Sequence, residues 1–241
     1  MHAGRHYSFT EVLLWTLRDT LIFPYLSGLQ FVMALRRTSP WSRIDQAFRK
    51  PPESTEQILH IEKYTEGEGP LKITTGPIAP LASLKELRRD VLGELMCRIL
   101  LRDTGGKPDV ERACAGWGGD RLVAWTRPGA PLTELPTIVW FSTWDTQKDA
   151  DEANAQLVKW LDQKVPVVPA RPTTPPALAP APQTYRRDAA GAEWSLTQKG
   201  HELALVIGAP ANTHPTLPAE IFRAWKAAEA PRPAPRPTTT P

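Results

Sequence analysis

The 241-residue sequence predicts an α+β fold, in which a helical N-terminal half is followed by a small antiparallel four-stranded sheet (ββαββα) with helices on one face. Two patterns along the chain predict it. Over residues 1–115, apolar side chains recur every three or four positions, which is the spacing of amphipathic helices. From Gly116 onward the pattern changes to the two-residue period that is typical of strands. We therefore expect a helical region over 1–115 and a region of antiparallel sheet plus helices over 116–229.

Capping residues and prolines set the bounds of the expected helices. Ser8 begins the first helix with a capping box that Glu11 completes, and Pro24 ends or kinks that helix. Ser54 begins a short helix with the same type of signature. The segment 20–35 is expected to be buried, because its 16 apolar-rich residues are fewer than the ~20 of a membrane span. The expected helices cover residues 9–24, 26–37, 41–50, 55–60, 83–102 and 109–115, with 71–74 as a candidate strand.

The sheet region contains two expected hairpins. The strands of the first pair across a long loop, and those of the second pair around the two-residue turn Lys199-Gly200. Thr146 begins the helix between the hairpins, because Asp149 completes its capping signature. A last helix is expected over 218–228. The expected strands cover residues 121–126, 137–144, 193–198 and 201–208.

Proline marks two further segments. The chain has 26 prolines, of which seven lie within residues 166–182 and five within 231–241. This density predicts a proline-rich insert at 165–184 and a disordered proline-rich tail at 230–241.

Bulk composition excludes several classes of function. A formal net charge of +3 is too weak to indicate a nucleic-acid-binding protein. Cys97 and Cys114 form neither a disulfide framework nor a zinc ribbon, so both are expected to be structural. The N-terminal segment lacks a small-residue cleavage site, so no signal peptide is expected. The apolar segment 20–35 is too short for a transmembrane helix, and the cytoplasm is the location predicted by default.

Two local patterns approach catalytic or binding motifs without completing them. The glycines of residues 116–120 (GWGGD) follow a helix and precede a strand, the reverse of a dinucleotide-binding loop, and we interpret them as a tight turn that needs positive φ. His201-Glu202 begins like a zinc-binding helix, but position 205 is leucine instead of the second histidine. We therefore predict no catalytic residue, no metal ligand and no cofactor.

Four stretches in order carry a family resemblance. They are Phe23-Pro24-Tyr25 with Gly28, Phe31-Val32 and Leu35; Trp41 to Phe48 leading into PPESTEQILHIEKY at 51–64; Leu92-Gly93-Glu94; and AGWGGDR at 115–121 followed by Thr143-Trp144-Asp145 and DADE at 149–152. Together they resemble the C-terminal half of a family of uncharacterised bacterial proteins that are predicted to be zinc metallopeptidases. The resemblance covers about residues 20–226, apart from the insert. The family's H-E-x-x-H helix lies upstream of the first stretch and has no counterpart in this sequence.

The resemblance implies a set of residues that line the family's cleft. Each of them has an alternative role in helix capping or packing, and this alternative stays open at the level of sequence. The candidate cleft residues are Ser54, Thr55, Glu56, Gln57, His60, Glu94, Trp117 and Asp120.

The sequence therefore predicts a non-catalytic, metallopeptidase-like protein, either a remnant or a split half, which binds a protein partner that supplies or covers the missing half. A catalytic zinc needs three protein ligands and an open position, and the sequence assembles no such set. The alternatives are a stand-alone module that binds a ligand or a protein, and an N-terminally truncated metallopeptidase. Exposed apolar side chains over residues 12–35 would favour a partner or a missing half.

Overall fold

The computed structural model describes residues 9–131, 133–165, 184–188, 191–211, 213 and 216–228. The expected cap at Ser8, most of the proline-rich insert and the C-terminal tail lie outside the described residues. The chain divides into two compact units after Pro70, with 71–228 in the second unit. The change of periodicity in the sequence falls later, at Gly116, because the second unit also includes helices that precede that residue.

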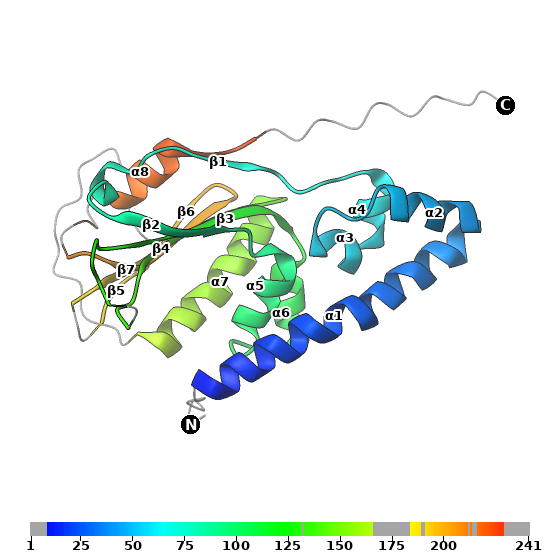
Figure 1. Ribbon diagram of the computed structural model, residues 1–241, viewed down its shortest axis with the longest axis horizontal. Helices are drawn as coiled ribbons and strands as arrows, with labels where there is room; N and C mark the ends of the chain where they lie inside the picture. The colour runs from blue at the N-terminus through cyan, green and yellow to red at the C-terminus, as the bar shows by residue number, and fades with distance from the viewer. Residues whose placement is uncertain are drawn as a thin grey trace. The chain divides into compact units, whose positions relative to one another are not determined.

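The first unit is built from helices (Figure 1). These helices are α1 Phe9–Thr38, α2 Trp41–Arg49, α3 Thr55–Leu59 and α4 Ile61–Glu66. Of the two outcomes expected at Pro24, an end of the helix is wrong, since the 30-residue helix α1 continues through this residue. A proline inside a helix removes one backbone hydrogen bond, and the long apolar side chains on both sides of Pro24 favour the helical state.

The core of the first unit is small. Phe31 and Leu35 of α1 are buried together with Ile44 of α2. The ring of Tyr64 from α4 packs edge-on against Phe31, with the ring centroids 5.1 Å apart. Partly buried side chains complete this cluster: Ala47, Ile58 and Ile61. The cluster holds α2, α3 and α4 against the C-terminal third of α1.

The second unit contains a six-stranded antiparallel sheet with the order β2-β3-β4-β7-β6-β5 and a separate two-stranded sheet, β1-β8. The fold is α+β, but the prediction of a four-stranded sheet is wrong. The strands are β1 Ile73–Thr75, β2 Lys85–Asp90, β3 Trp117–Thr126, β4 Thr137–Trp144, β5 Thr184–Arg187, β6 Glu193–Lys199, β7 Glu202–Ala209 and β8 Trp225–Ala227. The helices are η1 Ala79–Leu81 (a 3-10 turn), α5 Gly93–Leu101, α6 Lys107–Cys114, α7 Gln147–Lys164 and α8 Leu217–Ala224.

Strand β2 replaces the first half of the helix that was expected over 83–102. Leu87 and Val91, which suggested the helical stripe, are exposed, and the segment pairs with β3 at the edge of the sheet. Gly93 has a φ of +71°, a backbone conformation that glycine adopts readily, so the chain turns there and α5 begins. Four charges of β2 form two ion pairs, Arg88 with Asp90 and Arg89 with Glu86.

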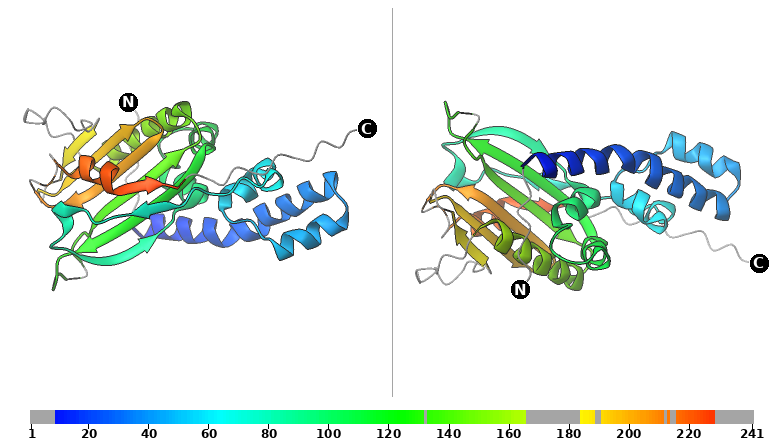
Figure 2. Two further views of the ribbon diagram at one scale, coloured as in Figure 1. Left: turned by 90° about the horizontal axis from the view of Figure 1, so that it is seen from above. Right: turned by 90° about the horizontal axis from the view of Figure 1, so that it is seen from below.

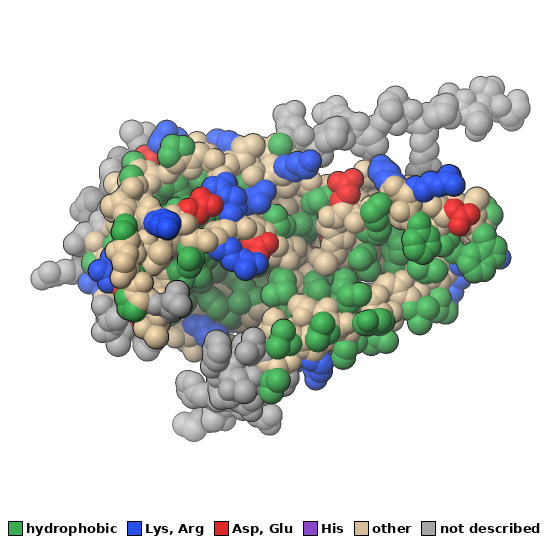
Figure 3. All heavy atoms as spheres, in the orientation of Figure 1, with side chains coloured by type: hydrophobic (Ala, Val, Ile, Leu, Met, Phe, Trp, Pro, Cys, Tyr) green, Lys and Arg blue, Asp and Glu red, His purple; other side chains and the backbone are tan. Residues whose placement is uncertain are grey.

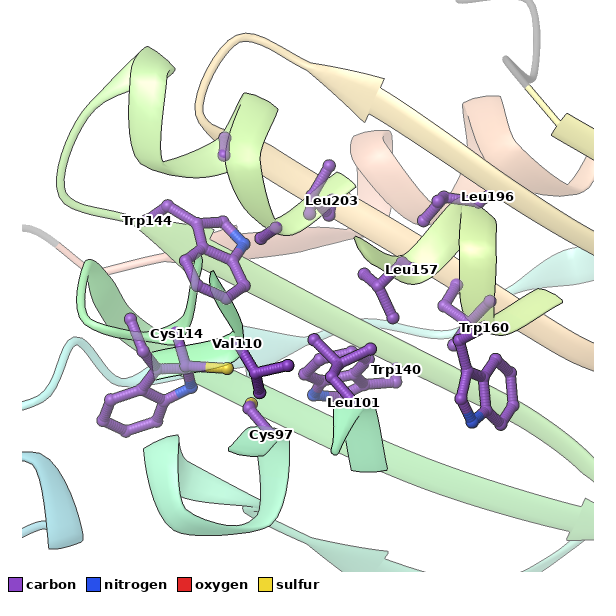
Figure 4. Packing of buried hydrophobic residues seen from close by; sticks show 14 of the residues in the cluster. Cys97, Leu101, Val110, Cys114, Trp140, Trp144, Leu157, Trp160, Leu196 and Leu203 are labelled. Carbon is purple, nitrogen blue, oxygen red and sulfur yellow. The ribbon is translucent and has the colours of Figure 1, made fainter. Parts of the chain in front are cut away.

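Both faces of the six-stranded sheet are covered, so the prediction of helices on one face is also wrong (Figures 1 and 2). One face packs against α5, α6 and α7, with Trp140, Trp144 and Leu157 in its core (Figure 4). The other face packs against α8, β1 and β8, with Phe141 and Trp225 in its core. Two apolar layers therefore enclose the central strands.

The two hairpins confirm the alternation read from the sequence. Trp140 and Trp144 of β4 lie in one apolar layer, whereas Val139 and Phe141 lie in the other. The turn between β6 and β7 lies one residue later than expected, because Lys199 pairs with Glu202.

The expected helix cap at Thr146 is confirmed. The Thr146 hydroxyl accepts a hydrogen bond from the Asp149 backbone N–H over 3.2 Å at the start of α7. Among the described helices, none combines the length and the apolar character that crossing a membrane requires.

Candidate functional site

The eight candidate cleft residues fall into two groups, one in each unit. The first unit holds the residues around α3, Ser54, Thr55, Glu56, Gln57 and His60. The second unit holds the residues around the start of α5 and β3, Glu94, Trp117 and Asp120. Each group therefore lies within one unit.

Ser54 and Gln57 fix the loop that precedes α3. The Ser54 hydroxyl accepts a hydrogen bond from the Gln57 backbone N–H over 3.3 Å, which confirms the cap expected from the sequence. The Gln57 side chain accepts from the Glu53 backbone N–H over 2.7 Å and donates to the Glu68 carbonyl over 2.6 Å. Gln57 therefore joins the segment before α3 to the segment after α4.

Glu56 forms a buried ion pair in the first unit. Its side chain is 2% exposed, and its Oε1 lies 2.6 Å from the Lys63 Nζ. The same ammonium lies 2.8 Å from the Glu68 carboxylate. Lys63 therefore balances the charge of Glu56, as a structural ion pair does.

His60 lies at the junction of α3 and α4. Its backbone N–H donates to the Glu56 carbonyl over 2.7 Å, and its Nδ1 lies 3.7 Å from a Glu62 carboxylate oxygen. Thr55, the first residue of α3, is partly buried. This group thus contributes to capping and turn geometry.

Asp120 is the central residue of the second group. Its carboxylate accepts hydrogen bonds over 2.8 Å from three donors: the backbone N–H groups of Leu92 and Gly93 and the indole Nε1 of Trp117. Burial raises the pKa of the Asp120 carboxyl above its ordinary value, although these donors act in the opposite direction. Asp120 thereby attaches the start of α5 to β3.

Glu94 lies one residue into α5 and is fully buried. Its Oε1 accepts from the Arg98 guanidinium, at 2.6 Å from Nη2 and 2.9 Å from Nε. Within the described residues, no three His, Cys, Asp or Glu side chains lie together in a way that could hold a metal ion.

Cys97 of α5 and Cys114 of α6 lie in the apolar layer that Figure 4 shows. Burial raises the pKa of the Cys114 thiol to about 12, and it raises the pKa of Cys97 as well. Both thiols are therefore neutral near pH 7, and a neutral thiol is a poor nucleophile and a poor metal ligand.

The glycines of residues 116–120 permit close packing, and the prediction of a turn with positive φ is wrong. Positive φ values occur at Gly93 and elsewhere in the described chain, but not at Gly116, Gly118 or Gly119. A β-carbon at Gly119 would collide with the Leu71 carbonyl, and one at Gly116 would collide with the Asp149 side chain. Glycine is needed here because two segments approach the backbone.

A pocket that the sequence did not indicate lies in the first unit. Its volume is about 360 Å³, and side chains of α2 and of the segments around α3 and α4 line it. Gln57 is the one candidate cleft residue among them. No sequence motif indicates this pocket, because its walls come from three short elements. The sequence pattern does not specify how these elements pack.

The largest departure from the sequence expectations concerns α1. The segment 20–35 was expected to be buried, yet nine apolar side chains of this helix are exposed (Figure 3). They are Leu14, Leu17, Leu21, Ile22, Tyr25, Leu26, Leu29, Val32 and Met33. A cluster of this size on one helix is typical of an interaction surface.

Comparison with known proteins identifies one family. Residues 81–216, more than half of the chain, match the family described as Domain of unknown function (DUF8575). No curated protein matches the chain, and no solved structure does. The matched segment lies within the second unit, so the helices of the first unit lie outside it.

Proposed function

The chain belongs to the DUF8575 family of domains of unknown function, and from that premise we propose that it is a non-catalytic binding protein that docks a protein partner along α1. The exposed apolar side chains of α1 carry this proposal. The candidate cleft residues give no competing catalytic role, since Glu56, Gln57 and Asp120 make contacts that maintain the local fold.

The exposed side chains form a continuous stripe. Leu14, Leu17, Leu21 and Tyr25 are separated by three, four and four residues, so they share one face of the helix. Gly28 follows at the next turn, and a β-carbon there would meet no atom within 4 Å. Small residues within an apolar stripe allow a second helix to approach closely, and this favours a helical partner surface.

The energetics also favour a partner. Moving a leucine side chain from water into an apolar interface contributes about 1.5–3 kcal/mol. Five such side chains would contribute about 8–15 kcal/mol before the entropic cost of association is subtracted. The cost of association, about 4–15 kcal/mol, offsets much of this gain, so the apolar side chains of α1 favour docking and the further contacts of the partner set the affinity.

The resemblance to predicted zinc metallopeptidases supports a narrower form of the proposal. The family's metal-binding helix precedes the segment that begins at Phe23, which lies within α1. A partner that supplies or covers such a half would contact α1 first. We propose this class of partner, and the purified chain alone is then expected to lack zinc-dependent peptide hydrolysis.

Site-specific photocrosslinking in the source organism tests the proposal. A crosslinker at Leu21 is expected to capture one protein repeatedly, whereas one at Leu87, an exposed leucine of the second unit, is not. The captured protein is then purified and titrated with the chain. Leu21→Glu is expected to weaken that complex at least tenfold, and Leu87→Glu is expected to leave it unchanged.

Three results would contradict the proposal. They are stoichiometric zinc with peptide hydrolysis by the chain alone, equal weakening by both substitutions, and sedimentation with lipid vesicles that Leu21→Glu abolishes. The last result would assign α1 to a membrane surface instead of a protein.

A further inference from the structure

The pocket of the first unit carries an unusual set of charges. Arg43, Arg49 and Lys50, which lie on α2 or directly after it, contribute three cations to its lining. Glu53 and Glu66 contribute two carboxylates. The pocket therefore presents both signs of charge within a volume of about 360 Å³.

The charged side chains of the pocket do not form ion pairs with the residues that the structure describes. Within the described part of the chain, none of the three cations is paired with a carboxylate, and neither Glu53 nor Glu66 is paired with a cation. Arg43 donates to the neutral amide of Gln46 over 3.0 Å, which leaves its charge uncompensated. Lys63 nearby shows the contrast, since it contacts two carboxylates at 2.6 and 2.8 Å.

The walls of the pocket are held in place by neutral contacts. The Tyr64 hydroxyl donates to the Lys50 carbonyl over 2.8 Å, which fixes the end of α2 against α4. Gln57 fixes the backbone at Glu53 through a 2.7 Å hydrogen bond. Gly67, with a φ of +78°, closes α4 at the rim. A site whose backbone is fixed in advance loses little conformational entropy when it binds a ligand.

From this arrangement we propose that the pocket binds a small zwitterion, whose oxyanion contacts Arg43, Arg49 and Lys50 and whose primary ammonium contacts Glu53 and Glu66. Guanidinium groups bind phosphate and carboxylate through charge-assisted hydrogen bonds, and carboxylates bind ammonium groups in the same way. The volume lies within the range of small-molecule sites. A simple anion would pair with the three basic groups and would offer no partner to the two carboxylates. A simple cation would pair with the carboxylates and would offer no partner to the basic groups.

This site is independent of the partner proposed for α1. None of the pocket residues belongs to the exposed apolar stripe. A chain that fails to bind a protein partner can therefore still bind the zwitterion, and the reverse also holds.

Calorimetric titration of the full chain with matched probes tests the proposal. Phosphoethanolamine and glycylglycine carry both charges, with phosphate and carboxylate as their respective oxyanions. Inorganic phosphate, acetate and ethanolamine each carry charge of one sign only. We expect at least one zwitterion to bind at least tenfold more tightly than each single-charge probe at equal ionic strength.

Variants assign the binding to the pocket. Arg49→Gln and Glu66→Gln are each expected to weaken the zwitterion about tenfold, the typical loss of one charge-assisted contact. Arg37→Gln, at the exposed end of α1 and outside the pocket, is expected to leave binding unchanged. Circular dichroism of each variant confirms that the helices are retained.

Several outcomes overturn the inference: no binding of either zwitterion at 10 mM, equal binding of a single-charge probe, or equal affinity in the two pocket variants and the wild type. If phosphoethanolamine binds, vesicles with and without phosphatidylethanolamine distinguish a lipid headgroup from a free ligand. Both of those sources agree with the inference.

Discussion

The two units of this protein differ in how far they bury large apolar side chains. In the second unit, Leu157 and Phe141 lie fully buried in apolar layers on the two faces of a sheet. In the first unit, Leu21 and Tyr25 of α1 are 66% and 78% exposed. Apolar side chains are therefore buried in this protein where the fold supplies a surface that covers them, and they are exposed where it does not. The second unit completes its own core, and the first unit leaves apolar surface available for a partner.

The largest expected effect is a difference in stability between two leucine-to-alanine variants, one at a buried position of the second unit and one at an exposed position of the first. Leu157→Ala is expected to lower the free energy of unfolding by about 2–5 kcal/mol, because it leaves a cavity in a packed layer. Leu21→Ala is expected to change it by less than about 0.5 kcal/mol, because the side chain is already in water. Urea denaturation followed by tryptophan fluorescence measures the first, and hydrogen exchange of the α1 amides measures the second. Similar losses in both variants would show that α1 is covered.

The second effect concerns polar groups in the interior of the second unit. Asp120→Ala is expected to cost about 3 kcal/mol, because two buried donors and one partly buried donor lose their acceptor. The control is Asp109→Ala, which removes an exposed ion pair with Arg112 and is expected to cost less than about 0.5 kcal/mol. Urea denaturation measures both. If the Asp120 variant were as stable as the control, its carboxylate would have no role in attaching α5.

The third effect is a pH dependence that arises from the buried thiols. Burial raises the pKa of Cys114 from 9.0 to about 12, so the unfolded chain releases this proton first as the pH rises. The native state then holds more protons than the unfolded state, and stability falls above about pH 9, by about 1.4 kcal/mol at pH 10. Below pH 8 the thiol is neutral in both states and contributes no pH dependence.

Comparing two variants isolates this effect from other titrating groups. Urea denaturation between pH 8 and pH 10 is expected to give a flatter stability profile for Cys114→Ala than for the wild type. Ser42→Ala, at an exposed position that does not titrate in this range, serves as the surface control and should keep the wild-type slope. Identical slopes in the wild type and Cys114→Ala would mean that the thiol is accessible to water.

The smallest expected effect concerns the helix cap at Ser54 in the first unit. Ser54→Ala removes the acceptor for the Gln57 N–H and is expected to destabilise α3 by about 1 kcal/mol. Amide hydrogen exchange over residues 55–66 measures this loss locally. Ser42→Ala, at an exposed position of α2 with no capping contact, is expected to stay within about 0.5 kcal/mol of the wild type. Unchanged exchange in the Ser54 variant would argue against the cap.

The sequence predicts best those elements whose own residues determine them. Strand β4 follows from a short apolar run whose successive side chains point to opposite faces, because both faces of the strand are buried in separate layers. Thr146 follows from a capping signature whose partner is three residues away. Strand β2 was missed because it lies at the edge of the sheet with most side chains in water, so burial imposes no alternation on it.

The candidate sites show the same limit. The cap at Ser54 is local and was predicted, whereas the hydrogen bonds from Leu92 and Gly93 to Asp120 span 28 and 27 positions and were not. The exposure of α1 was missed for a related reason. Hydrophobicity indicates that a surface favours burial, but not whether the chain supplies a covering element.

The charged edge strand β2 also bears on how this protein behaves when it is concentrated. An open sheet edge is a template onto which another chain can add a strand, and repeated addition leads to fibrils. At β2, an incoming copy would meet Lys85, Arg88 and Arg89 together with their acidic partners, and it would have to remove these groups from water. Concentrated solutions are therefore expected to resist fibril growth from this edge.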